Sequence, residues 1–346
     1  MSLSRPATFP LLKLPFLCFE AVVKSWDIFD IIFFALNSKR TRQVMRNLNI
    51  PLIRIEVYLE NYKHIMLGNS KKNWVFKNER ETRTRFEEQY QDFSEYSLVL
   101  QKNAIPLYTR RTNDALKSYT YGNTMNALRM AMEFLNEVFN CSIETVNIYE
   151  DNFPLSGNIG VKSTENMCIN TRSSQPFGYA QSKKLSLLLE NLEVTDTCDF
   201  WMRNIERDFY VNPKLLKCRK LVFGARSAVW VTREILMKFE VPQLRFYYCP
   251  FSVEDILSFI TNWFHSDNKE LKYLLIYIQS TQFSLEKFQT EDLNPLPFSG
   301  RTRIPPIETY TVFDFSVGLE IVRHDGLVAT IYVNNEVFLF HIWHSQ

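Results

Sequence analysis

Residues 218–278 read CRKLVFGARSAVWVTREILMKFEVPQLRFYYCPFSVEDILSFITNWFHSDNKELKYLLIYI, and this stretch carries the clearest signals of secondary structure in the chain. Short runs rich in β-branched and aromatic residues predict three strands, at Cys218–Phe223, Gln243–Tyr247 and Leu271–Ile278. The amphipathic stretches between them predict two helices, from about Val229 to Phe239 and from Ser252 to His265. Because strands joined through crossover helices run parallel, the stretch predicts a parallel sheet with helices in its connections.

The same alternation extends toward the N-terminus. It predicts a strand at Thr145–Tyr149, a strand near Leu185–Val194, and a helix that contains Phe200, Trp201 and Ile205. The centres of the later strands, Leu221, Leu244 and Leu274, lie 23 and 30 residues apart. That spacing is close to one strand and one helix per unit, so residues 141–280 or so are interpreted as a short, irregular leucine-rich-repeat-like array.

Antiparallel strands are predicted on both sides of this array. Leu319–Arg323, Leu327–Val333 and Val337–Trp343 read as a meander, and residues 53–59 alternate between apolar and polar. We expect the strands near 52–76 to pair with the meander at 313–344. Between them, Thr124 to Asn140 carries apolar residues at helical spacing. The expected fold class is therefore α+β with an α/β array, that is, a strand-helix array flanked by an antiparallel sheet.

The N-terminal stretch Phe9–Leu36 is almost continuously apolar. Leu14-Pro15 opens one predicted helix, Asp30 is a plausible cap for a second, and Ser38 caps a third that runs through Leu48. Helices that are apolar on every side are normally buried on every side, which a segment of about 40 residues cannot achieve alone. Either the rest of the chain or a separate polypeptide must therefore complete the burial.

Composition and motifs exclude several functional classes. The net charge of +2 is too small for a broad nucleic-acid surface, and the nine glycines form no phosphate-binding loop. The six cysteines are scattered, which is typical of buried thiols in a reducing compartment. His341 and His344 lie on a predicted strand, where a spacing of three places side chains on opposite faces. No catalytic motif is present, and Cys218 lies in a predicted buried strand, so we expect no enzyme activity, metal or cofactor.

Two stretches resemble parts of one known family. FPLLKLPFLCFEAVVKSWDIFDIIFFALNSKRTR, residues 9–42, is similar to an F-box: it has the Leu14-Pro15 pair and, later, Leu36-x-Ser38-Lys39-Arg40. Phe251-Ser252-Val253-Glu254-Asp255-Ile256-Leu257-x-Phe259-Ile260-x-x-Trp263 and the closing Arg323-His324-Asp325-Gly326-Leu327 resemble the F-box-associated domain of a large nematode family. The resemblance implies an F-box at residues 1–50 and a substrate-recognition domain at residues 51–346.

The resemblance also implies a function and its partners. The chain would be the substrate-recognition subunit of an SCF-type E3 ubiquitin ligase, binding a Skp-type adaptor, and through it a cullin, together with an unknown target protein. The residues that match the adaptor-binding positions of the motif are Leu14, Pro15, Leu17, Phe19, Val22, Val23, Ile28, Ile31 and Ile32. A stand-alone interaction scaffold, with its N-terminal helices packed onto its own repeats, is the alternative. We expect an intracellular protein, cytoplasmic or nuclear, with no nucleic-acid or membrane partner. The loop residues Arg301 and Arg303 are candidate contacts for an acidic or phosphorylated partner.

Overall fold

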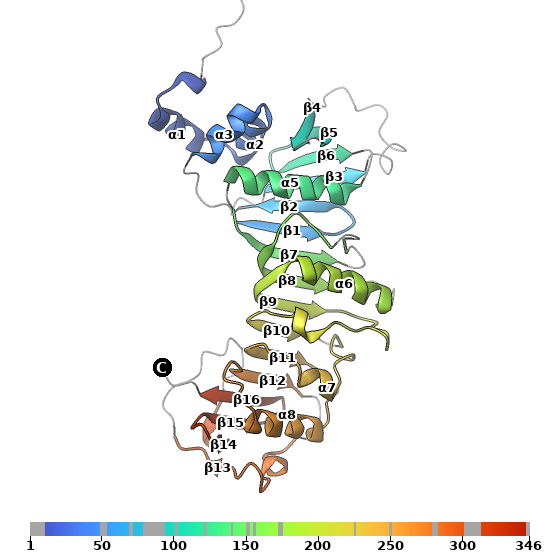
Figure 1. The fold of residues 1–346 in the computed structure, drawn as a ribbon, viewed down its shortest axis with the longest axis vertical. Coiled ribbons are helices and arrows are strands. Elements are labelled where there is room, and N and C mark those ends of the chain that lie inside the picture. Colours follow the sequence, from blue (N-terminus) through green and yellow to red (C-terminus); the bar gives the residue numbers. More distant parts are fainter. Residues whose placement is uncertain are drawn as a thin grey trace, which may run out of the picture. The chain divides into compact units, whose positions relative to one another are not determined.

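The structure is a computed structural model of the 346-residue chain. It describes residues 11–48, 54–68, 72–78, 94–100, 103–120, 123–139, 141–149, 153–154, 157–171, 176–224, 226–248, 251–278, 283–300 and 313–343, with backbone only at 94–100 and 103–110. Helices and strands are mixed throughout (Figure 1), which confirms the expected α+β class. The chain divides into two compact units, and the N-terminal helices belong to the first.

The first unit is built on a sheet with strand order β1-β2-β3-β6-β5-β4. Its strands are β1 (Ile55–Leu59), β2 (Lys63–Leu67), β3 (Lys72–Asn78), β4 (Ser94–Leu100), β5 (Asn103–Arg111) and β6 (Ala115–Thr120). Helix α5 (Thr124–Phe139) packs on β2 and β3, and its phenylalanine Phe134 meets Trp74 of β3 edge to face. The apolar positions that predicted this helix, Leu128, Met132, Leu135 and Phe139, are all buried.

Short helices form the N-terminal segment: η1 (Leu11–Lys13), α1 (Phe16–Lys24), α2 (Ile28–Leu36) and α3 (Lys39–Arg46). The predicted cap Ser38 is confirmed, since its Oγ accepts from the backbone N–H of Thr41 at 3.0 Å. The cap predicted for the second helix is wrong. Asp27 takes that position and accepts from the N–H of Phe29 at 2.9 Å, because its backbone is extended while Asp30 is already helical.

Ion pairs and packing join α2 and α3 to the sheet and to α5 within the first unit. Lys72 pairs with Asp27, and Arg111 pairs with Asp30. Arg42 of α3 lies 3.5 Å from Glu137 of α5, with its guanidinium 5.2 Å from the ring centre of Phe134. The chain thus buries much of its own N-terminal segment.

The second unit contains the predicted parallel array, with strand order β7-β8-β9-β10-β11-β12-β16-β15-β14-β13. Register between neighbours confirms parallel pairing from β7 to β12 and antiparallel pairing from β12 onward. The strands are β7 (Ile143–Tyr149), β8 (Ser163–Asn170), β9 (Glu193–Trp201), β10 (Lys220–Phe223), β11 (Gln243–Tyr247), β12 (Tyr273–Tyr277), β13 (Leu296–Pro297), β14 (Leu319–Val322), β15 (Val328–Val333) and β16 (Val337–Trp343).

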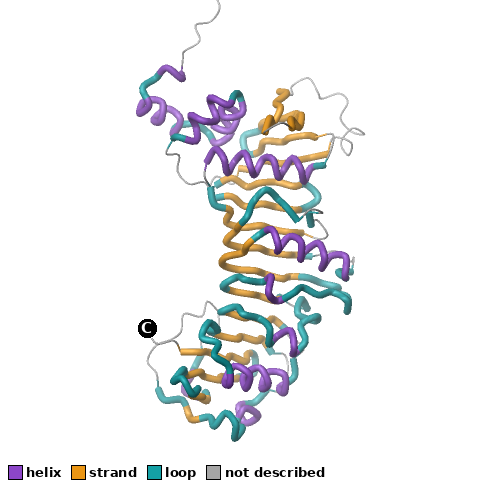
Figure 2. Tube along the Cα trace, viewed as in Figure 1, coloured by secondary structure: helices purple, strands orange, loops and turns teal. Residues whose placement is uncertain are grey.

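Helices and short 3₁₀ turns connect these strands (Figure 2). They are α6 (Tyr179–Asn191), η3 (Pro213–Leu215), α7 (Arg233–Leu236), α8 (Val253–His265), η4 (Leu285–Phe288) and η5 (Phe315–Val317). On one face of the sheet, three rings stack in register across neighbouring strands. The ring centroid of Phe223 lies 5.2 Å from that of Phe200 and 4.9 Å from that of Phe246. On that same face Trp263 of α8 packs edge to face on Phe340.

Several sequence predictions for this unit are wrong. Residues 185–194 were expected as a strand, but all except the last few lie in α6, where Leu185, Leu188 and Leu189 recur at helical spacing. Phe200 and Trp201 end β9 and are not helical, and α7 covers only a short part of Val229–Phe239. The meander at 313–344 pairs with β12 and not with the strands near 52–76, which pair with one another and with β6.

Candidate functional site

Helix α1 is apolar on both its buried and its exposed sides. Phe19 and Val23, one turn apart, are buried at 3% and 1% exposure. The opposite side, here called the α1 outer face, consists of the exposed residues Leu17, Cys18, Ala21 and Val22. Leu17 is 76% exposed, and Phe16 at the helix start is 51% exposed. An amphipathic surface helix normally turns polar residues outward, so this face has the composition of a contact surface.

The residues that match adaptor-binding positions differ in exposure to solvent. Pro15, Leu17 and Val22 are exposed, and Leu14 and Ile28 are half-buried. Phe19, Val23, Ile31 and Ile32 are buried within the first unit. The chain itself therefore buries most of α2, and the exposed apolar side chains lie on α1.

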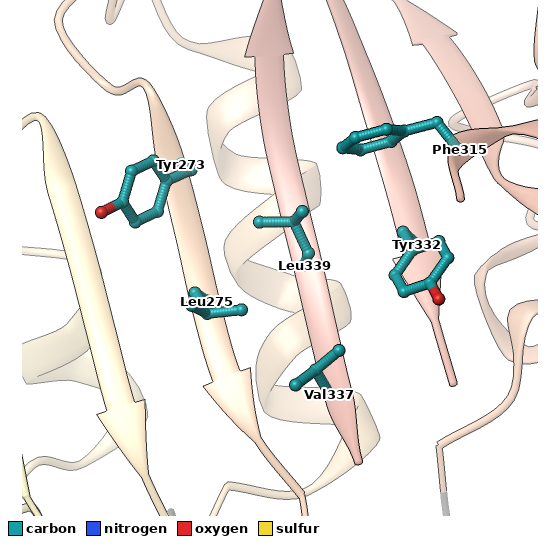
Figure 3. Packing of buried hydrophobic residues seen from close by; sticks show 6 residues of the cluster. All are labelled: Tyr273, Leu275, Phe315, Tyr332, Val337 and Leu339. Carbon is teal, nitrogen blue, oxygen red and sulfur yellow. The ribbon is translucent and has the colours of Figure 1, made fainter. Parts of the chain in front are cut away.

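The second unit contains an apolar cluster on the sheet face opposite α8. Figure 3 shows Tyr273, Leu275, Leu339 and Val337 projecting from this face, with Phe315 and Tyr332 beside them. This cluster is buried, and Tyr277 packs at its margin.

An aromatic row continues from that margin across the strand ends, and we call Trp201, Tyr247 and Tyr277 the aromatic strip. Tyr247 and Tyr277 stack at 4.5 Å with 7° between their planes, and Trp201 lies 5.5 Å from Tyr247. Trp201 reaches across β10 because Gly224 follows that strand: a Cβ there would lie 2.1 Å from Cε3 of the indole. The strip is only partly covered, and Trp201 is 39% exposed.

Polar and charged side chains lie beside the strip on the same face. Asp199, Lys220 and Arg245 occupy neighbouring strands, and Arg245 donates to the hydroxyl of Tyr273 at 3.3 Å. Burial raises the pKa of the Asp199 carboxyl above its usual value, and the positive charges of Lys220 and Arg245 offset part of that rise. The sheet places these groups side by side, and their proximity could not be predicted because they come from separate strands.

Burial suppresses ionisation of three of the thiols that the structure describes. Burial raises the pKa of Cys141 and of Cys168 to about 11 and raises that of Cys198 well above its usual value. Cys218 is buried, as expected, but lies two residues before the start of β10. Cys18 is exposed on the α1 outer face, so the expectation of buried thiols is wrong for this residue.

The remaining candidates from the sequence are described only in part. His341 is buried in β16, and within the described ranges no three His, Cys, Asp or Glu side chains gather as a metal site would require. His344, Cys249, Arg301 and Arg303 lie outside the described residues. Among the helices that the structure describes, none combines the length and hydrophobicity needed to span a bilayer.

Comparisons with known proteins bear on the second unit and on the whole chain. A family model described as F-box associated matches residues 200–276, which run from the end of β9 through β12 and include α8. An uncharacterized protein of Caenorhabditis elegans is 22% identical over 339 residues, covering 93% of this chain and 74% of that protein. No solved structure matches the chain. The matched segment forms the centre of the parallel array, so this part of the chain is similar to an F-box-associated domain.

Proposed function

We propose that the chain is the substrate-recognition subunit of an SCF-type E3 ubiquitin ligase. Its N-terminal helices would act as an F-box that binds a Skp-type adaptor and, through it, a cullin. The second unit, with its leucine-rich-repeat-like parallel strands, would hold the target protein. In this proposal the chain is non-catalytic and intracellular, and it uses no cofactor.

The observation that carries the proposal is the α1 outer face. Leu17, Cys18, Ala21 and Val22 are exposed together although none of them is charged. The other side of the same helix is already buried by Phe19 and Val23, so the outer face is not needed to hold α1 on the first unit. Burying a side chain such as leucine contributes about 1.5–3 kcal/mol, which makes this face a favourable contact for an apolar partner groove.

The proposed mechanism is positional. An F-box holds the adaptor while the F-box-associated domain holds a target, so both belong to one assembly. Tethering of this kind raises the effective concentration of the target near the conjugating enzyme, to about millimolar for short flexible links. Transfer of ubiquitin then requires no reactive group in this chain.

Co-purification of a Skp-type adaptor with the full chain tests the proposal. Leu17→Asp places a charge on the α1 outer face, and we expect it to abolish co-purification. Since Leu17 is 76% exposed, the variant retains its fold, as circular dichroism and thermal unfolding would verify. Val229→Asp is the matched control, because Val229 is also an exposed apolar residue, at 50%, but lies in the second unit.

Adaptor binding by Leu17→Asp at the wild-type level would contradict the proposal. The stand-alone scaffold is the second candidate function, and the burial of Phe29, Ile31 and Ile32 within the chain favours it. It predicts no adaptor binding by the wild-type chain and resistance of α1 to proteolysis without any partner.

A further inference from the structure

A cavity of about 460 Å³ lies between the loop that precedes β11 and the C-terminal turns of α8. This volume falls within the range of about 300–1,000 Å³ that is typical of ligand sites. The described residues that line the cavity lie between 237 and 271, within the segment 200–276 that matches the F-box-associated family. Its apolar wall consists of buried or half-buried side chains, Met237, Phe239, Phe259, Trp263 and Leu271.

Two carboxylates line the same cavity, those of Glu240 and Glu270. Both residues are exposed, and they are the charged residues among the described ones that line the cavity. Neither carboxylate forms an ion pair or accepts a hydrogen bond within the described part of the chain. The cavity therefore carries negative charge that the chain itself does not pair, which favours a cationic ligand.

The loop that carries Glu270 is held in place by hydrogen bonds. Oδ1 of Asn268 accepts from the backbone N–H of Glu270 at 2.9 Å and from that of Leu271 at 3.2 Å. The carbonyl of Asn268 accepts in turn from Nη1 of the buried Arg323 at 2.8 Å. The backbone at this carboxylate is thus ordered by the chain alone, so a ligand does not have to order it.

The same two glutamates also border a second cavity, of about 770 Å³, whose lining includes the cations Lys214, Lys217 and Arg219. Arg219 pairs with Asp196, with 2.5 Å between its Nε and the carboxylate. Among the described residues, none of the three cations forms an ion pair with either glutamate. The basic side of this second cavity therefore leaves both carboxylates available to a ligand.

Trp263 indicates that the ligand is a polypeptide. Trp263 is only 2% exposed, it lines the first cavity, and its buried Nε1–H has no acceptor in the part of the chain that the structure describes. A buried donor is costly when it lacks an acceptor, and a polypeptide brings carbonyl oxygens that a metal ion does not. Two carboxylates are also too few for a metal site, and no group of three possible ligands gathers within the described ranges.

We infer that the first cavity binds a lysine or arginine side chain of a polypeptide, with its cationic group on Glu240 and Glu270. Hydrogen bonds between such cations and carboxylates are charge-assisted and therefore strong. The aliphatic stems of lysine and arginine favour apolar surroundings while their charged ends stay near water, which fits an apolar wall beside exposed carboxylates. The inference rests on the proposed function, because it supplies the chemistry of the target that the F-box-associated domain would hold.

Selection from a random peptide library displayed on phage, panned on the immobilised full chain, tests this inference. We expect the enriched peptides to carry an excess of Lys and Arg. Synthetic copies of them should bind the full chain in fluorescence anisotropy, more weakly as NaCl rises. Copies in which citrulline replaces Arg and acetyl-lysine replaces Lys should lose binding, because these residues are uncharged. The double variant Glu240→Gln/Glu270→Gln should weaken binding by about tenfold or more, since it removes the charge of both contacts at nearly constant side-chain size.

Glu190→Gln/Glu291→Gln provides the matched control, because it makes the same charge change at two exposed glutamates of the second unit that do not line the cavity. It should leave binding unchanged, and circular dichroism verifies the fold of both double variants. Enrichment of acidic or neutral peptides, no enrichment, or equal binding by the two double variants would overturn the inference. Adaptor co-purification separates this failure from failure of the proposed function. A chain that binds the adaptor but no basic peptide contradicts only this inference, whereas a wild-type chain that binds no adaptor contradicts the proposed function.

Discussion

At the scale of single residues, the lack of a side chain at Gly224 leaves room for the indole of Trp201. Trp201 fills the space above Gly224, so the aromatic strip continues from Trp201 of β9 to Tyr247 of β11. We predict that Gly224→Ala displaces the indole and destabilises the chain by about 1–3 kcal/mol, because an added methyl group in a filled site forces neighbours to move. Urea unfolding followed by circular dichroism measures the loss.

A double-mutant cycle isolates the cause of this effect. In a Trp201→Ala background the clash is gone, so Gly224→Ala should cost much less there. Equal costs in both backgrounds would show that the glycine is needed for another reason. The sequence shows that Gly224 follows a predicted strand, but its contact with Trp201 of another strand is visible only in the structure.

A second residue-scale prediction concerns the buried Arg323. Its Nε and Nη2 donate to the carboxylate of Asp325 at 2.9 and 2.8 Å, and Nη1 donates to the carbonyl of Asn268 at 2.8 Å. The guanidinium holds the pKa of Asp325 well below its usual range. A lowered folded-state pKa means that this stabilisation is complete above the unfolded pKa of about 4 and is lost as the pH falls below it.

Asp325→Asn should therefore lower the free energy of unfolding at neutral pH, and the gap from the wild type should narrow as the pH falls below about 4. Urea titrations of both proteins at several pH values measure the gap. A gap that stayed constant into the acid range would contradict the assignment of this ion pair.

At the scale of elements, α8 was predicted with its boundaries because local signals agree. Ser252 accepts from the N–H of Asp255, and Asp255 accepts from the N–H of Ser252 at 3.0 Å, and together these bonds form a capping box. Prediction failed between 185 and 205, where α6 and β9 adjoin. There Leu185, Leu188 and Leu189 carry a helical period, while Val194, Cys198 and Phe200 alternate with polar residues as a strand does.

The capping box yields the element-scale prediction. Ser252→Ala should destabilise the second unit by about 1 kcal/mol, because the first turn of α8 loses a hydrogen-bond acceptor. Ser284→Ala is the control, since Ser284 precedes η4 but makes no side-chain capping bond. Urea unfolding of both variants compares them, and equal stabilities would contradict the role assigned to Ser252.

At the scale of the whole molecule, the N-terminal helices were foreseen but their attachment was not. The pairs Asp27–Lys72 and Asp30–Arg111 join residues far apart in the chain, and no local pattern reports such contacts. The apolar composition of the segment predicted that it must be buried. The structure buries part of it within the first unit and leaves the α1 outer face exposed. The proximity of the three rings of the aromatic strip could not be predicted from the sequence, because parallel strands bring distant residues together.

The proposed adaptor binding requires that a second polypeptide cover the α1 outer face. Hydrogen–deuterium exchange of the full chain, with and without a purified Skp-type adaptor, measures it directly. We predict slower exchange of the α1 amides, residues 16–24, when the adaptor is present, with α5 and α8 unchanged. Exchange of α1 that is already slow in the free chain and unaffected by the adaptor would contradict the claim.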